Sequence, residues 1–230
     1  MRLEALRLAA IVGVVALWLP TASGAFTVDT FSTPSPPSVF TVGTTPAATH
    51  SGTGILGTRT LSSSAALTAG STVSIGGGTF QVFTSTLALE STLTYSGAGF
   101  PLNLTGQGLQ LDFTFLDGGT PTTTVFAVTL NTSTGALTGS ITLADSLVPF
   151  SALLSFASLT GPGTLGSVNS LSIGFNDTGS PQAGADFILD ALSIEPAGSV
   201  SVPEPSSMMV LGAAVLGVLW QVRRRGRRGK

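Results

Sequence analysis

Strict alternation of apolar and polar residues is the feature that most narrows the folds open to this chain. Residues 109–115 read Leu-Gln-Leu-Asp-Phe-Thr-Phe, and the stretches 126–130 and 171–175 repeat the pattern. Successive side chains of a β-strand point to opposite faces of the sheet, so a period of two predicts strands with one buried and one solvated face. Between residues 26 and 201 no stretch shows the 3.6-residue period of an amphipathic helix.

Glycine-rich turns separate the alternating stretches. The spacing of strands and turns, on the order of ten to fifteen residues, is typical of a sandwich rather than of a helical or α/β fold. We therefore expect an all-β domain over residues 26–195, built as a jelly-roll-like antiparallel β-sandwich. The expected turns lie at residues 76–78, 96–99, 117–119, 133–135 and 161–163.

The last alternating segment of this domain changes phase in its middle. Phe187 and Leu189 share one parity, whereas Leu192 and Ile194 share the other. A β-bulge inserts one extra residue into a strand and so reverses the parity of the residues after it. A bulge near Asp190 would place all four apolar side chains on the core side.

Charge is distributed very unevenly along the chain. Nine acids lie between Asp29 and Glu195, and Arg59 is the lone Lys or Arg between residues 8 and 222, so the middle of the chain carries about −8. Such a domain has almost nothing with which to displace phosphate counterions, so we expect no nucleic acid partner. The chain has no cysteine, which excludes disulfides, thiolate metal sites and thiol catalysis.

The N-terminus has the three parts of a secretory signal peptide. Arg2 and Arg7 make a positive start, residues 8–19 are apolar or small, and small residues lead up to Ala25. Signal peptidase removes segments with this pattern. We expect residues 1–25 to be cleaved, and the domain after them to be exported.

The C-terminus combines an apolar segment with a basic end. Residues 208–222 contain Gln221 as their one polar side chain, and a helix over 206–222 is long enough to cross a bilayer with local thinning. By the positive-inside rule the basic end stays in the cytoplasm, which puts the domain outside the inner membrane. The arginines of this topogenic end are Arg223, Arg224, Arg225, Arg227 and Arg228.

The motif Val202-Pro203-Glu204-Pro205, followed by the apolar segment and the arginine cluster, resembles the PEP-CTERM sorting signal of Gram-negative and related bacteria that make extracellular polysaccharide. The resemblance implies a sorting tail over residues 202–230, joined to the domain by a linker at 196–201. It also implies recognition and removal by exosortase, a membrane-embedded cysteine transpeptidase. A Pro-x-Pro segment cannot be helical, so it offers an extended, accessible strip at the membrane surface.

Two further resemblances concern the domain. Residues 185–195 resemble the last strand of jelly-roll domains in secreted bacterial proteins. Residues 54–61, together with 93–97, are similar to sandwich domains that precede PEP-CTERM tails.

Candidate catalytic residues are few. His50, the sole histidine, lies in an expected loop, and no Gly-x-Ser-x-Gly elbow accompanies it. Glycosidase chemistry needs two carboxylates at a defined separation. Asp112 with Asp117, or Asp186 with Asp190, are neighbours in sequence without being evidence of such a pair. We predict a protein without catalytic residues that is not an enzyme.

A structural calcium ion is the one cofactor that the sequence leaves open. Calcium takes hard oxygen ligands, and jelly-roll domains often hold it near their ends. Asp29, near the first strand, and Asp190, at the expected bulge, would supply carboxylates if the terminal strands lie together. For Arg59 we expect an ion pair with one of the acids inside or beside the sandwich.

Together these features predict an exported, non-enzymatic surface or extracellular-matrix protein, with roles in exopolysaccharide and biofilm. Its predicted partners are signal peptidase, an exosortase-like transpeptidase and, transiently, the inner membrane. Two alternatives stay open: a carbohydrate- or calcium-binding module, and a permanently membrane-tethered periplasmic domain. Extracellular polysaccharide is left open as a partner through loops and carboxylates. Stacking on sugar rings is poorly supplied, because Trp18 and Trp220 lie in the terminal segments and the domain is poor in stacking aromatics.

Overall fold

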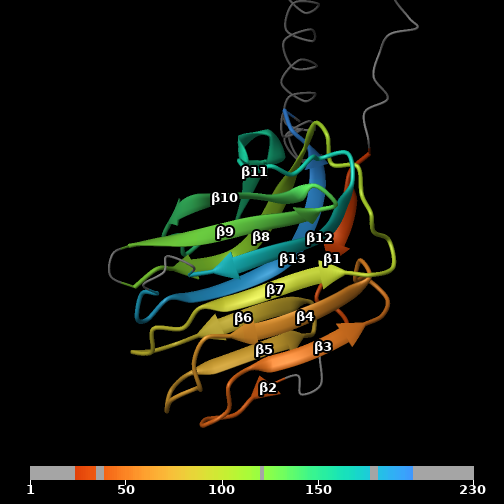
Figure 1. The fold of residues 1–230 in the computed structure, drawn as a ribbon. Coiled ribbons are helices and arrows are strands. Elements are labelled where there is room, and N and C mark those ends of the chain that lie inside the picture. The colour runs from red at the N-terminus through yellow and green to blue at the C-terminus, as the bar shows by residue number, and fades with distance from the viewer. Residues whose placement is uncertain (1–23, 35–38, 120–121, 177–180, 199–230) are drawn as a thin grey trace, which may run out of the picture. The chain divides into compact units, whose positions relative to one another are not determined.

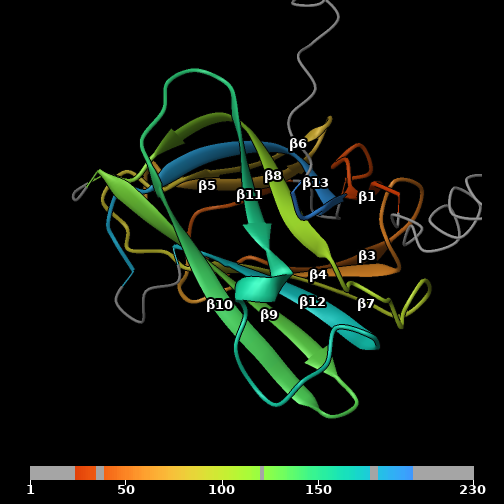
Figure 2. The same cartoon turned by 90° about the horizontal axis from the view of Figure 1, so that it is seen from above.

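The computed structural model describes residues 24–34, 39–119, 122–176 and 181–198. Two antiparallel β-sheets pack face to face (Figures 1 and 2), which confirms the predicted all-β, jelly-roll-like sandwich. Within the described residues no helix is long and apolar enough to cross a membrane. Residues 1–23 of the predicted signal peptide and the predicted transmembrane helix at 206–222 lie outside the described residues.

One layer is a seven-stranded sheet with the order β11-β8-β13-β6-β5-β2, in which β1 also pairs with β13. All its pairings are antiparallel. Its strands are β1 (Phe26–Asp29), β2 (Val39–Phe40), β5 (Thr72–Gly76), β6 (Thr79–Phe83), β8 (Gln107–Asp117), β11 (Phe150–Ser155) and β13 (Asp186–Pro196).

The other layer is a six-stranded sheet with the order β10-β9-β12-β7-β4-β3. The chain passes back and forth between the layers, and a short 3₁₀ helix, η2 (Phe156–Ser158), follows β11. The strands of this sheet are β3 (Ala47–Ser51), β4 (Thr58–Ser63), β7 (Ser91–Ser96), β9 (Thr123–Thr132), β10 (Gly135–Ala144) and β12 (Val168–Phe175).

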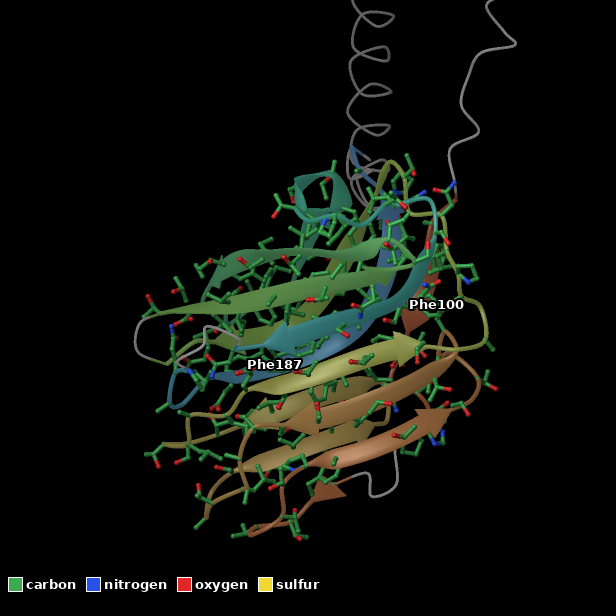
Figure 3. The ribbon with its side chains drawn as sticks, viewed as in Figure 1. Phe100 and Phe187 are labelled. Carbon is green, nitrogen blue, oxygen red and sulfur yellow. The ribbon has the colours of Figure 1, made fainter. Side chains whose placement is uncertain are left out.

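Phenylalanine rings from both sheets meet in the middle of the sandwich. Phe187 of β13, labelled in Figure 3, stacks on Phe175 of β12 with ring centroids 5.1 Å apart. The same ring meets Phe80 of β6 edge-on at 5.4 Å, and Phe113 and Phe126 pack beside them. Buried aromatic pairs in stacked and edge-to-face geometry add to the free energy gained from burial itself. The alternation seen in the sequence thus places one ring after another between the layers.

The predicted bulge in β13 is confirmed. The register of β13 against β8 shifts twice: it skips Thr114 of β8 between Ile188 and Leu189, and Asp190 of β13 between Leu189 and Ala191. Asp190 is the extra residue in β13. On either side of it the apolar side chains point inward, with Phe187 2 % exposed and Leu189, Leu192 and Ile194 fully buried. One inserted residue therefore reconciles the two parities.

The prediction that His50 lies in a loop is wrong. Residues Ala47–Ser51 form the edge strand β3, in which His50 lies opposite Arg59 of β4. Sequence alternation missed this strand because its side chains are small or polar. The strand is held by backbone pairing to β4 rather than by an apolar face of its own.

Candidate functional site

A buried ion pair joins the two layers of the sandwich. Arg59 of β4 donates from Nη1 to Asp29 Oδ2 of β1 at 2.7 Å, and both side chains are fully buried. The prediction of an ion pair for Arg59 is confirmed. Because β1 belongs to the seven-stranded sheet and β4 to the six-stranded sheet, the pair bridges them.

Further hydrogen bonds complete the surroundings of this pair. The Tyr95 hydroxyl donates to Asp29 Oδ2 at 2.9 Å, and the Phe31 backbone N–H donates to Oδ1 at 2.8 Å. Arg59 Nη2 donates to the Thr33 carbonyl oxygen at 2.9 Å. The guanidinium carbon also lies 5.8 Å from the centroid of the Phe31 ring, within the range of a cation–π contact.

Burial controls the ionisation of this cluster. Burial raises the pKa of Asp29, and the Arg59 charge together with the donors Phe31 N–H and Tyr95 O–H opposes that rise. Burial also raises the pKa of Tyr95 well above its ordinary value, and the Asp29 charge adds to the effect. Tyr95 is therefore a neutral hydrogen-bond donor to the carboxylate, and the cluster has a structural role.

The two residues proposed for calcium lie in different surroundings. Asp29 gives both carboxylate oxygens to protein donors inside the sandwich, whereas Asp190 accepts from the exposed Thr114 hydroxyl at 2.6 Å. The described residues contain no group of three or more His, Asp or Glu side chains placed to hold a metal ion. The terminal strands do pair, with Asp29 of β1 opposite Leu192 of β13. The two carboxylates nevertheless bind different donors, and calcium binding stays a prediction.

The outer side of β8 and β11 carries a second polar group. Asp112 Oδ1 accepts from Gln110 Nε2 at 2.9 Å and from Ser151 Oγ at 2.5 Å. Glu195, on the neighbouring strand β13, accepts from Ser193 Oγ at 3.1 Å. These carboxylates are held by hydrogen bonds to side chains of their own sheet.

Other carboxylates bind backbone N–H groups where strands end. Asp117 accepts from Gly119 N–H at 2.9 Å, and Asp145 accepts from Gly118 N–H at 2.7 Å. Asp186 accepts from Thr84 N–H at 2.7 Å. The Asp117 contact closes a tight turn, whereas Asp145 and Asp186 tie together segments that are distant in sequence.

Two acids that the sequence analysis did not pair lie opposite each other in the seven-stranded sheet. Asp186 of β13 faces Asp117 of β8 in the register of the two strands. Burial raises the pKa of Asp186, the Thr84 N–H opposes the rise, and the Asp117 charge adds to it. No local pattern indicated this pairing, because residues so far apart meet only through the register of β8 and β13.

The two packed antiparallel sheets define a β-sandwich domain with a polar cross-link between its layers. The chain also carries the PEP-CTERM protein-sorting motif: residues 201–225 match that family. The predicted sorting signal is thereby confirmed. The match includes Val202, Pro203, Glu204 and Pro205 and ends at Arg225, so Arg227 and Arg228 come after it. These sorting residues lie outside the described residues.

No curated protein matches the chain. One similar solved structure is a family 11 carbohydrate-binding module from Clostridium thermocellum, in complex with a β-1,3-1,4-mixed-linked tetrasaccharide. It is 15 % identical to this chain with a TM-score of 0.40, and the match covers 77 % of this chain and 98 % of that one. The agarase AgWH50C is 11 % identical with a TM-score of 0.46, covering 78 % and 25 %. A family 30 module of a C. thermocellum cellulase is 10 % identical with a TM-score of 0.41, covering 76 % and 99 %. Likeness at this level carries no argument about what this chain binds.

Proposed function

We propose that this chain is a non-enzymatic protein whose β-sandwich acts at the cell surface or in the extracellular polysaccharide matrix. The observation that carries the proposal is the sorting motif at residues 201–225, which begins a few residues after β13 ends at Pro196. A PEP-CTERM signal indicates an exported protein that is processed at the membrane. The sandwich is therefore the part that acts after export.

The processing step can be inferred from the order of the tail's elements. The helix over 206–222 would hold the chain in the inner membrane, with Arg223 and the arginines after it in the cytoplasm. Pro203 and Pro205 keep the residues just outside the membrane extended. An exosortase-like transpeptidase would bind this strip, cut near it and release the domain from its anchor.

The non-enzymatic part of the proposal is supported by how the domain uses its ionisable groups. Asp29, Asp112, Asp117, Asp186 and Asp190 each accept hydrogen bonds from protein donors. These bonds cross-link the layers, fix turns or tie neighbouring strands. A carboxylate held in this way is satisfied by the fold itself, whereas a catalytic acid or base must reach a substrate.

Intact mass of the protein from the envelope and medium of its native host tests the proposal. We expect a species that ends between Val202 and Pro205. A variant with Pro203, Glu204 and Pro205 all replaced by alanine should keep Lys230 and stay in the membrane. Ser199→Ala, in the linker before residues 201–225, is the control and should be processed normally.

Retention of the tail would be equally informative. If the unaltered protein keeps Lys230 and remains in the inner membrane, the domain is a permanently tethered periplasmic one, and the surface role is refuted.

A further inference from the structure

The outer face of the six-stranded sheet presents a row of hydroxyl groups that crosses every strand. Burial alternates along these strands, so the residues between the core positions face outward. The registers of neighbouring strands place one outward serine or threonine of each strand next to that of the adjacent strand. From β10 to β3 the row is Thr138, Thr129, Ser172, Thr94, Thr60 and Thr49.

Two further rows flank this one, and we call the three together the hydroxyl face. Figure 3 views the sandwich from the side of this sheet. In the part of the chain that the structure describes, none of the outward residues of these six strands is charged or aromatic. The polar members of the flanking rows are Asn131, Ser170, Ser96, Thr58 and Ser51 on one side, and Ser140, Thr92 and Ser62 on the other.

Contacts between neighbours hold several of these groups in place. Thr94 Oγ1 and Ser172 Oγ lie 2.9 Å apart, and Asn131 Nδ2 donates to Ser170 Oγ at 3.0 Å. A hydroxyl has one donor and two acceptor positions, so each keeps capacity for a ligand. The groups recur about every 4.8 Å across the strands and about every 6.8 Å along them. The face is thus a grid of hydrogen-bonding groups on rigid backbone.

The opposite sheet has a different character. All acidic residues in the described strands belong to the seven-stranded sheet, on β1, β8 and β13. Arg59 is the lone Lys or Arg in the described strands, and its guanidinium is bound to Asp29. The fold therefore separates a sheet with acidic strands from a sheet whose described strands carry no charge on their outer face, although the two kinds of strand are mixed in the sequence.

The absence of charge on the hydroxyl face limits the kinds of ligand that can bind there. An anionic polymer would meet a domain of net charge about −8 and no exposed guanidinium on this face. A ligand recognised by stacking would find no aromatic ring among the outward residues of the described strands of this sheet. What remains complementary is an uncharged polymer that itself presents closely repeated hydroxyls.

We infer that the hydroxyl face binds a neutral polysaccharide through hydrogen bonds to its hydroxyl groups. The inference rests on the proposed function, which brings the domain to a polysaccharide matrix. A single hydrogen bond in water contributes about 0.5–1.5 kcal/mol net, so short oligosaccharides should bind weakly. A long chain engages several rows at once and many copies of the domain, so avidity should make polymers bind far better than their fragments.

Affinity electrophoresis of the full chain in a zwitterionic detergent tests this inference. The gels contain a neutral mixed-linked β-glucan, a neutral galactomannan or anionic alginate. We expect retardation by at least one neutral polymer and none by alginate. The variant Thr60→Val/Thr94→Val/Ser172→Ala removes three adjacent hydroxyls with little change in shape and should lower the apparent affinity by about tenfold or more.

Two control variants separate binding from folding. Thr72→Val/Ser74→Ala makes the same kind of change on the outer side of β5 in the other sheet and should bind as the unaltered chain does. Thr60→Ser/Thr94→Ser keeps the hydroxyls and should retain binding. Circular dichroism of each variant checks that the sandwich is intact.

Several results would overturn the inference. These are no retardation by either neutral polymer, equal retardation of the triple variant, or retention by alginate. Self-association that the triple variant abolishes would show that a second copy of the chain covers this face instead. If binding fails while the tail is still removed normally, the inference falls and the proposed function stands.

Discussion

Removing the charge of Arg59 tests whether a buried ion pair joins the two layers. In Arg59→Met the Asp29 carboxylate stays between the sheets with Tyr95 O–H and Phe31 N–H as donors but without its counter-ion. Breaking a buried ion pair from one side costs about 3–5 kcal/mol. In a domain of this size 1 kcal/mol lowers the midpoint of thermal unfolding by about 2–4 °C, so we expect a fall of about 6–20 °C.

Thermal unfolding followed by far-ultraviolet circular dichroism measures this change. Tryptophan fluorescence is unsuitable, because Trp18 and Trp220 both lie in the terminal segments rather than in the sandwich. The double variant Asp29→Asn/Arg59→Met removes both charges and leaves no isolated ion. Its loss should be smaller than the sum of the two single losses by about 0.5–3 kcal/mol, the usual coupling between groups in direct contact.

The reasoning is refuted if each single variant loses less than about 1 kcal/mol and the losses add. Values that small are typical of exposed ion pairs. They would mean that Arg59 and Asp29 meet in water and do not join the two layers.

Three further predictions concern the core, a turn and the pH dependence. Phe187→Ala should cost about 3–5 kcal/mol in the free energy of unfolding, since it empties the centre of the aromatic cluster; a loss below about 1 kcal/mol by urea titration would contradict the packing. Gly57→Ala should destabilise the domain more than Gly77→Ala, although both glycines have positive φ. A Cβ at residue 57 meets the Ser96 carbonyl oxygen, whereas a Cβ at residue 77 meets nothing within 4 Å. Asp186 has a raised pKa in the folded state, so its contribution to stability is full below pH 3.8 and is lost as pH rises through the folded-state value. The urea midpoint of Asp186→Asn should therefore depend less on pH above 3.8 than that of the unaltered chain, and an equal slope would refute the assignment.

The sequence predicted those strands whose inward residues are large. β8, β9, β12 and the bulged β13 carry clear apolar alternation, and most of their expected core residues are buried. Phe115 of β8 is an exception, because the register against β13 skips Thr114 and Leu116 is buried in its place. β3 and much of β10 escaped prediction, because small and polar residues there leave almost no periodic signal. Their pairing is determined by the neighbouring strand rather than by their own composition.

The sequence could not predict which acid forms the ion pair with Arg59. The need of Arg59 for an anion could be predicted from charge alone, but nine acids were available. The choice of Asp29 depends on β1 and β4 lying in opposite layers, which no local pattern encodes. The hydroxyl face could not be predicted from the sequence for the same reason, because its rows can be recognised only when the registers of all six strands are known.

The central position of β13 has a consequence for the timing of folding. This last strand fills the gap between β8 on one side and β6 and β1 on the other. Until residue 196 has been synthesised, the seven-stranded sheet is split into pieces whose facing edges have no partner. Pairings between distant segments also form slowly. The chain should therefore remain unfolded, and able to thread through a narrow export channel, until almost all of the domain has been made.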